Sequence, residues 1–310
     1  MKVWASHLAV VALLLALGVL LPPYHATNMA RIMVLAVFAM GYNLAFGYTG
    51  LLSLGHALFF AAGMYAAGLP IWHWGLGAAP GLILGLLGGG IVAGVTGLLA
   101  LRTAGVSFMI VTLMFAQAGY LTLLYFNGVT GGDEGFALPA AGRMLFGADL
   151  STDLPRYLTA WALFSATFLA TLALVRSRFG RVMVALRENE ERARMLGINP
   201  FTAKLAVLAL SGAASGLAGA AYGVLFGYAG ASFATIQYSI LPMLYVLLGG
   251  AGTVAGPLLG AILMFALIEV ANDLTSAWLF VVGAVLVIVV LFAPKGILGA
   301  LRDRFFRGLP

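Results

Sequence analysis

Residues 81–101 read GLILGLLGGGIVAGVTGLLAL and contain no charged side chain. An α-helix rises about 1.5 Å per residue and the hydrocarbon core of a bilayer is about 30 Å thick, so a run of this length crosses a membrane once. Its glycines would weaken a helix in water, but in a bilayer they let helix backbones pack closely. The stretch therefore predicts a membrane-spanning helix that packs against other helices.

The whole chain shares the composition of this stretch. Hydrophobic residues make up 63% of its 310 positions and charged residues only 8%, whereas a soluble domain carries about 25% charged residues. Cysteine is absent, which excludes disulfides and thiolate metal sites. We therefore expect an all-α integral membrane protein in which residues 1–310 form a single transmembrane domain.

Apolar runs predict about ten transmembrane helices, because each crossing takes about 20 residues. The runs are residues 8–21, 30–46, 57–74, 81–101, 105–126, 157–175, 203–228, 238–250, 254–272 and 277–294. An alternative has eight helices, in which some of these runs do not cross the membrane separately. The same face of the protein then points to the cytoplasm only if the number of crossings falls by pairs. The first run resembles a signal peptide, but no small-residue cleavage site follows it, so we interpret it as an uncleaved first helix.

The basic residues indicate the orientation. If the helices alternate, three of the sixteen lysines and arginines lie on one face and the rest on the other. The three are Arg31, Arg143 and Arg156. Positive residues collect on the cytoplasmic side, which places both termini and a loop at about 176–202 there. A loop at about 127–156 is then outside. Because the basic residues sit between apolar runs, the net charge of +6 does not indicate nucleic acid binding.

The inner loop contains the most charged stretch, residues 181–196, which read RVMVALRENEERARML. Its apolar positions recur every three or four residues, at Val182, Leu186, Ala193 and Leu196, and Asn189 interrupts them once. This spacing predicts one amphipathic helix that ends at Gly197. Its polar face contains two oppositely charged pairs four residues apart, Glu188 with Arg192 and Glu190 with Arg194. Two interpretations stay open: a helix resting among lipid headgroups, or one that docks into a cytoplasmic partner.

Residues 47–56 read GYTGLLSLGH and would make a poor lipid-facing helix. Irregular backbone is tolerated at membrane depth only where it is buried in protein or lines water. One interpretation is a broken helix near a transport pathway, and the other is a cytoplasmic turn in which His56 caps a helix. The candidate pathway residues in and beside this stretch are Asn43, Tyr48, Ser53 and His56. A second glycine cluster, residues 249–257, has the same ambiguity.

Glu269 is a further pathway candidate, because ionisable residues inside a bilayer are costly and usually functional. It lies near the end of its predicted helix, so it could instead reach the outer interface. No P-loop motif is present, so we expect no ATP binding by this route. The four histidines are scattered and no acid–base set shares one depth. We therefore expect no catalytic residues, no metal site and no enzyme activity.

In this order, five motifs resemble the LivM-type permease subunits of branched-chain amino acid ABC importers, in the hydrophobic amino acid uptake family. The motifs are Gly47-Tyr48-Thr49-Gly50 with Ser53-Leu54-Gly55-His56, Thr130-Gly131-Gly132 with Gly135, Arg187-Glu188-Asn189-Glu190 with Gly197-Ile198-Asn199, Gly249-Gly250-Ala251-Gly252-Thr253 with Gly256-Pro257, and Phe292-Ala293-Pro294-Lys295-Gly296. The resemblance runs from about Asn43 to Gly299. The chain departs from the family at Leu51, where a polar residue is frequent, and at Asp133-Glu134, where a serine–aspartate pair is common.

The resemblance implies a permease of the bacterial inner membrane with four kinds of partner: a LivH-type second permease, two ATP-binding subunits, an extracytoplasmic amino-acid-binding protein and membrane lipid. It implies that ATP is bound by the partners and that this chain holds no cofactor. The coupling residues would be Arg187, Glu188, Asn189, Glu190 and Gly197. The binding protein would dock at Thr130, Gly131, Gly132, Asp133 and Glu134. Urea or short-chain amides are the alternative substrates, and a self-sufficient carrier or channel is the alternative class.

Overall fold

The computed structural model describes residues 2–274, 277–292 and 296–299. Its long helices are α1 (Lys2–Leu20), α2 (Pro23–Asn43), α3 (His56–Trp74), α4 (Ala78–Ala100), α5 (Val106–Tyr125), α7 (Asp153–Arg176), α10 (Pro200–Phe226), α11 (Ile236–Gly249), α12 (Gly256–Leu274) and α13 (Trp278–Phe292). The basic residues Lys295, Arg302, Arg304 and Arg307, and the motif residues 293–295, lie outside the described residues.

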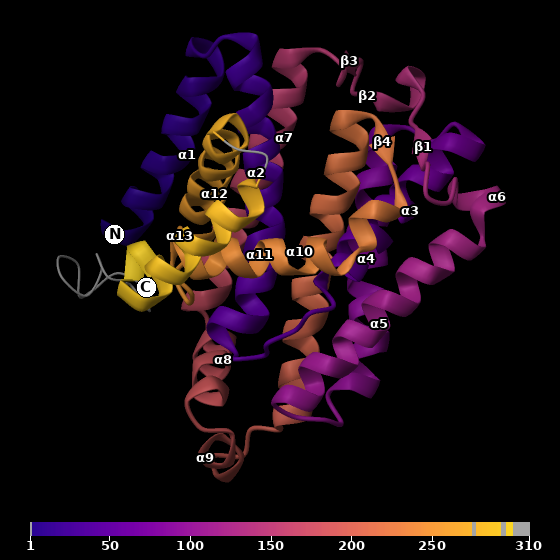
Figure 1. The fold of residues 1–310 in the computed structure, drawn as a ribbon. Coiled ribbons are helices and arrows are strands. Elements are labelled where there is room, and N and C mark those ends of the chain that lie inside the picture. The colour runs from indigo at the N-terminus through magenta and orange to yellow at the C-terminus, as the bar shows by residue number, and fades with distance from the viewer. Residues whose placement is uncertain (1, 275–276, 293–295, 300–310) are drawn as a thin grey trace.

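Short elements join these helices. They are the π-helix η1 (Leu44–Tyr48), α6 (Asn127–Thr130), β1 (Phe136–Ala137), the 3-10 helix η2 (Ala140–Arg143), β2 (Met144–Leu145), β3 (Ala148–Asp149), α8 (Arg178–Glu188), α9 (Glu190–Met195), β4 (Tyr228–Ala229) and the 3-10 helix η3 (Ala231–Ala234). Strand β1 pairs antiparallel with β4, and β2 with β3. Helices α8 and α9 form one end of the molecule, the α8–α9 end, and the β2–β3 hairpin lies at the opposite end, the hairpin end (Figure 1).

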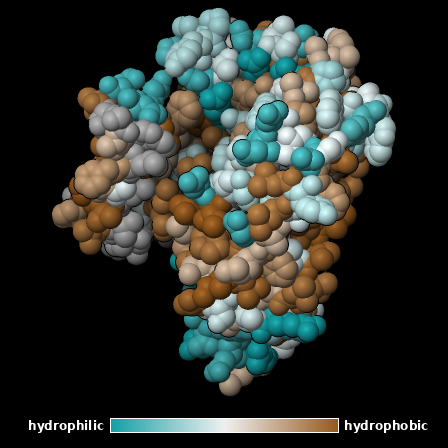
Figure 2. All heavy atoms as spheres, turned by 45° about the vertical axis from the view of Figure 1, so that its right-hand side comes forward, coloured by the Kyte–Doolittle hydropathy of each residue, from teal (hydrophilic) through white to brown (hydrophobic). Residues whose placement is uncertain are grey.

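The surface and helix lengths fit a multi-pass membrane protein. Figure 2 shows a hydrophobic band across the middle of the face in view, with hydrophilic residues gathered at the two ends. Within the described part of the chain, 6 helices are long and apolar enough to cross a membrane. They are α2 with η1, α4, α5, α7, α10 and α12. The prediction of an all-α membrane protein is confirmed at this level.

All ten predicted runs coincide with helices, but their number of crossings stays a prediction. Helix α11 has only 14 residues and lies across the upright helices in Figure 1. Helix α2 begins at Pro23, seven residues before the predicted start at 30. Proline is favourable at the first helical position because its φ is already helical and its missing N–H would have no partner there.

Helix α2 forms the centre of the fold, since every residue from Ile32 to Asn43 is buried. Beside it, α10 packs closely against α3 and α4 along glycines. A Cβ added at Gly89 of α4 would overlap the carbonyl oxygen of Gly212 and the Cα of Gly216 in α10. Glycine is therefore needed here for backbone contact, as the run 81–101 predicts.

Replacing Gly89 with alanine should lower the free energy of unfolding by about 1–3 kcal/mol, because α4 and α10 must move apart to admit a methyl group. Gly94→Ala is the matched control in the same helix, since nothing lies within 4 Å of the added Cβ. Thermal unfolding in detergent measures both variants. Equal unfolding temperatures for the Gly89 and Gly94 variants would contradict the close packing.

Candidate functional site

The predicted coupling segment consists of two helices, so the prediction of one continuous helix over 181–196 is wrong. Helix α8 ends at Glu188 and α9 begins at Glu190, and Asn189 between them is extended, with φ −161° and ψ 107°. The Asn189 Oδ1 accepts a hydrogen bond from the backbone N–H of Arg192 at 2.8 Å. Asparagine side chains compete for backbone N–H groups in this way and start a new helix.

The break changes which charged pairs form. Glu190 contacts Arg194 at 3.7 Å, as predicted, and also contacts Lys204 of α10 at 2.5 Å. The predicted pair of Glu188 with Arg192 spans the break and is not among the ion pairs of the described residues. Glu188 is exposed at the end of α8.

The apolar side of the segment is only partly covered. Leu186 and Ala193 are buried, as the predicted stripe requires, and Met183 joins them. Leu196 is 76% exposed and the neighbouring Met195 86% exposed, so the stripe is wrong at its end. The tip of α9 therefore presents apolar side chains to its surroundings. Gly197 has φ +82° and turns the chain toward α10.

Arg187 joins the coupling segment to the helix break. Its Nη1 donates a hydrogen bond to the carbonyl oxygen of Gly47, which lies in η1. Gly252, in the turn between α11 and α12, lies beside the same contact, because a Cβ there would be 3.0 Å from Nη1 and 3.1 Å from the Gly47 carbonyl oxygen. Gly50, with φ +75°, lies against the Arg187 side chain. Three motifs far apart in sequence therefore meet at one point.

Asn43 connects two of these segments directly. Its Nδ2 donates to the Thr253 carbonyl oxygen at 2.9 Å, and its Oδ1 accepts from the Gly252 N–H at 3.0 Å. Asn43 is completely buried. A Cβ at Gly47 would overlap the Asn43 side chain, so glycine is required one turn later. The end of α2 is thus held to the α11–α12 turn through one amide.

The segment between α2 and α3 is irregular and largely buried in protein, and its place beside a transport pathway stays a prediction. Helix α2 changes into η1, and irregular backbone follows until α3 begins at His56. Tyr48 and Ser53 are buried in protein, and the Ser53 Oγ accepts from the Gly55 N–H at 3.1 Å. The alternative role of His56 as a helix cap is wrong, because its side chain makes no cap hydrogen bond.

His56 instead links three helices. Its Nε2 lies 2.8 Å from the Ser211 Oγ in α10, and that hydroxyl donates to the Gly41 carbonyl oxygen in α2 at 2.6 Å. Because a hydroxyl has one proton, Nε2 is the donor to Ser211. His56 is completely buried and packs edge-on against Tyr42. The arrangement positions α3 against α2 and α10.

A groove of about 1000 Å³ lies beside the Arg187 junction at the α8–α9 end. Its charged side chains are mostly basic: Arg102, Arg187, Arg194 and Lys204, against the single acid Glu190. The groove can therefore receive an acidic surface. No group of three or more metal-ligating side chains occurs in the described part of the chain.

The outer-loop candidates form a compact turn. The Thr130 hydroxyl donates to the Leu123 carbonyl oxygen at 2.6 Å and accepts from the Gly132 N–H at 3.2 Å. Gly131 and Gly132 both have positive φ, of +75° and +57°. Asp133 and Glu134 are exposed at the tip of this turn, so their charges face the surroundings.

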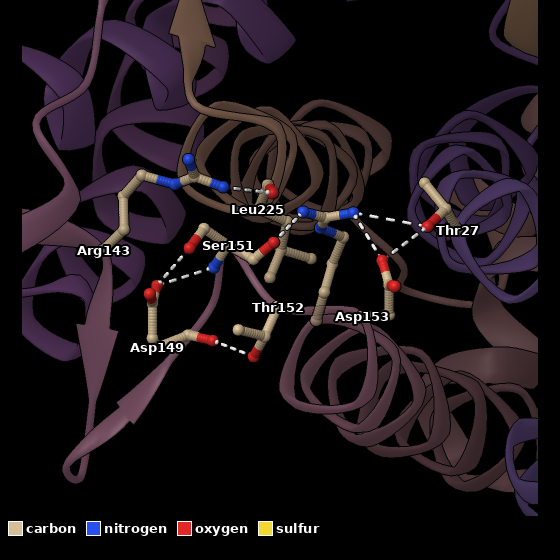
Figure 3. Close-up of polar contacts among 8 residues, drawn as sticks. Thr27, Arg143, Asp149, Ser151, Thr152, Asp153 and Leu225 are labelled. Carbon is tan, nitrogen blue, oxygen red and sulfur yellow. Dashed lines mark hydrogen bonds and ion pairs between the residues drawn. The ribbon is translucent and has the colours of Figure 1, made fainter. Parts of the chain in front are cut away.

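The predicted topology places three arginines, Arg31, Arg143 and Arg156, on the face opposite the other basic residues. Two of them form hydrogen bonds with protein acceptors at the hairpin end. Arg143 donates to the carbonyl oxygens of Val224 and Leu225 at 2.8 and 2.7 Å, and so caps the C-terminus of α10. Figure 3 shows the contact with Leu225. Arg156 contacts Ser151, Thr27 and Asp153. Burial, followed by the nearby Arg156, lowers the pKa of Arg143. Hydrogen bonds from Ser151 lower the pKa of Asp149.

Arg31 is the third of these arginines, and the sequence prediction underrated it. A helix starting at 30 places Arg31 at the membrane surface, whereas the start at Pro23 places it two turns inside α2. The signal was Pro22-Pro23, which marks a helix start. Its guanidinium carbon lies 5.1 Å from the centre of the Phe226 ring. Glu269 lies nearby at the same end, where it is exposed and accepts from the Tyr24 hydroxyl at 3.0 Å.

Comparison with known proteins gives the family. The chain is 28% identical to the high-affinity branched-chain amino acid transport system permease protein LivM of Salmonella typhimurium strain LT2, over 88% of this chain and 69% of the relative. It is also 28% identical to LivH of the same organism, over 85% and 91% of the two chains. The probable LivM of Methanocaldococcus jannaschii is 25% identical over 77% of this chain and 78% of its own length.

No solved structure matches the chain significantly. The family match covers residues 25–290, and so includes the segment between α2 and α3, the Arg187 junction and the turn from Thr130 to Glu134. The relatives are transport permease components, not enzymes. This chain belongs to the family described as the branched-chain amino acid transport system / permease component.

Proposed function

We propose that this chain is the permease subunit of an ATP-binding cassette importer for branched-chain amino acids, and that it forms half of the translocation pathway. The observation that carries the proposal is the Arg187 junction, in which one side chain of the charged segment reaches both the helix break and the α11–α12 turn. A membrane protein that carries out no chemistry itself needs such a route to receive a conformational signal from a partner.

The coupling segment is the docking element in this proposal. Arg187, Glu188, Asn189, Glu190 and Gly197 would place α9 against an ATP-binding subunit, with the exposed Met195 and Leu196 at the contact. Two such subunits bind ATP, and this chain holds no cofactor. Their nucleotide state shifts the permease between outward-open and inward-open forms only if each state makes different contacts with the docked segment.

The remaining partners follow from this orientation. The α8–α9 end and both termini face the cytoplasm, and the hairpin end faces outward from the inner membrane. A LivH-type permease completes the pathway, with Asn43, Tyr48, Ser53 and His56 near it and Glu269 at its outer mouth. The turn from Thr130 to Glu134 receives the amino-acid-binding protein. Its exposed Asp133 and Glu134 fit a basic surface on that protein.

Uptake of labelled leucine tests the proposal. Cells that lack the gene should regain leucine uptake when it is restored, and ATP depletion should remove that uptake, because the driving force comes from the partner subunits. Labelled urea is the parallel substrate. Restored urea uptake alone would overturn the amino acid assignment, and leucine transport by the purified chain without partners would make it a self-sufficient carrier.

A further inference from the structure

A groove of about 650 Å³ opens at the hairpin end between α2, α12 and the start of α7. It is lined by a cation, two carboxylates and an apolar wall. The residues that matter here are Thr27 and Arg31 from α2, Asp153 from α7, and Phe265, Ile268 and Glu269 from α12. The groove therefore offers a ligand a positive charge, negative charges and an apolar surface.

Arg31 has no hydrogen-bond acceptor within the described part of the chain. Among the residues that the structure describes, no hydrogen bond or ion pair involves its guanidinium, and its Nε is buried without a partner. The other two arginines at this end differ, since Arg143 donates to two carbonyl oxygens and Arg156 to Ser151, Thr27 and Asp153. A charge about 12 Å along a membrane helix is costly and is usually functional. Arg31 is thus available for a ligand.

A carboxylate suits this guanidinium, because the planar fork of arginine binds both oxygens of a carboxylate at once. Two carboxylates in the groove suit a positively charged group on the same ligand. Glu269 uses Oε1 for the Tyr24 hydroxyl, and Asp153, whose Oδ1 also contacts Arg156 and Thr27, is half exposed at the same groove. Phe265 and Ile268 offer an apolar surface between them. Urea has no carboxylate and offers Arg31 only a neutral carbonyl oxygen, without the charge or the paired oxygens that the guanidinium fork matches.

We propose that this groove is an amino-acid-binding site of the permease itself, in which Arg31 binds the α-carboxylate, Glu269 and Asp153 attract the ammonium, and Phe265 and Ile268 contact the apolar side chain. The inference rests on the proposed function, from which it takes the substrate class. It adds a selection step that follows release from the binding protein and depends on the carboxylate.

Ligand-observed NMR on the assembled transporter in nanodiscs, without binding protein, tests the site. Leucine and 4-methylpentanoate, which keeps the carboxylate, should both give saturation-transfer signals, whereas leucinamide, which lacks it, should give none. Arg31→Gln should weaken leucine binding about tenfold or more, because it removes a charge-assisted pair. Arg31→Lys keeps the positive charge but not the planar fork, so its affinity for leucine should lie between those of the unchanged chain and Arg31→Gln.

Arg176→Gln is the matched control, since it removes the same charge from an exposed position at the α8–α9 end. It should bind leucine as the unchanged chain does. Thermal unfolding of each variant checks that the fold is intact. Equal leucine binding by a folded Arg31→Gln variant, or equal signals from leucinamide and leucine, would overturn the site.

The phosphate of a lipid headgroup could satisfy the same guanidinium. Nanodiscs of phosphatidylcholine and of phosphatidylglycerol separate this source from the amino acid. Leucine binding that is the same in both lipids supports the proposal. Phosphatidylglycerol retained by the unchanged chain but lost in Arg31→Gln, with no leucine signal in either lipid, would assign the site to lipid instead.

Uptake distinguishes failure of the site from failure of the proposed function. With the binding protein present, Arg31→Gln should lower the maximal rate of leucine uptake about tenfold with little change in KM, because the binding protein captures leucine first. Normal uptake together with unchanged binding overturns the site and leaves the importer in place. Uptake of urea alone by the unchanged chain overturns the function.

Discussion

Arg187→Gln is expected to reduce leucine uptake to background while the ATP-binding subunits still bind and hydrolyse ATP. The reason is geometric, because Arg187 of α8 donates to the carbonyl of Gly47 in η1 and passes beside Gly252. Glutamine is shorter and uncharged, so the signal from the docked segment no longer reaches the helix break. ATPase activity and uptake measured on the same proteoliposomes show this uncoupling directly.

Two comparison variants locate the defect. Arg181→Gln removes the same charge from the same helix at an exposed position, and uptake should stay close to that of the unchanged chain. Glu188→Lys should abolish uptake in a different way, by preventing the ATP-binding subunits from copurifying, while its level in the membrane stays normal. Coupled uptake by Arg187→Gln at the normal ratio to ATP hydrolysis would show that the junction does not carry the signal.

Asn43→Leu is expected to destabilise the fold and abolish uptake together. Leucine has a similar size but leaves the Gly252 N–H and the Thr253 carbonyl without the partners they have in the structure. Each unsatisfied buried group costs about 1–3 kcal/mol. Thermal unfolding and leucine uptake are the two measurements.

Asn43→Asp gives a sharper comparison for this amide. It keeps the acceptor for the Gly252 N–H but removes the donor to Thr253, so about half of the contact survives, and a buried charge is added. Asn272→Leu is the control for stability, because Asn272 is exposed near the end of α12. An unfolding temperature for Asn43→Leu equal to that of the control would contradict the role of Asn43.

Local pattern predicted the helices well and the coupling segment only in part. The runs of apolar residues are long, so each coincides with a helix whatever its neighbours do. Asn189 was interpreted as an interruption of one helix, but in the structure its side chain caps a second helix. The period of the apolar residues continues across the break, so periodicity alone could not reveal it.

The position of the charged residues depended on helix boundaries, which the pattern gives poorly. Starting α2 at 30 instead of Pro23 hid the depth of Arg31. Glu269 was correctly placed near a helix end, and its contact with Tyr24 joins residues 245 positions apart. Which residue contacts Glu269 depends on how the helices pack, and the local sequence pattern holds no information about that packing.

The sequence by itself determined that this protein lies in a lipid bilayer, that it is helical, and which family it belongs to. A bilayer requires long uncharged helices, and that requirement acts on composition alone. Only the tertiary structure decided that Gly47, Arg187 and Gly252 meet, and that among the described residues Arg31 has no hydrogen-bond acceptor while Arg143 and Arg156 have theirs. Contacts between segments far apart in the sequence depend on how helices pack, and many packings are compatible with one hydropathy pattern.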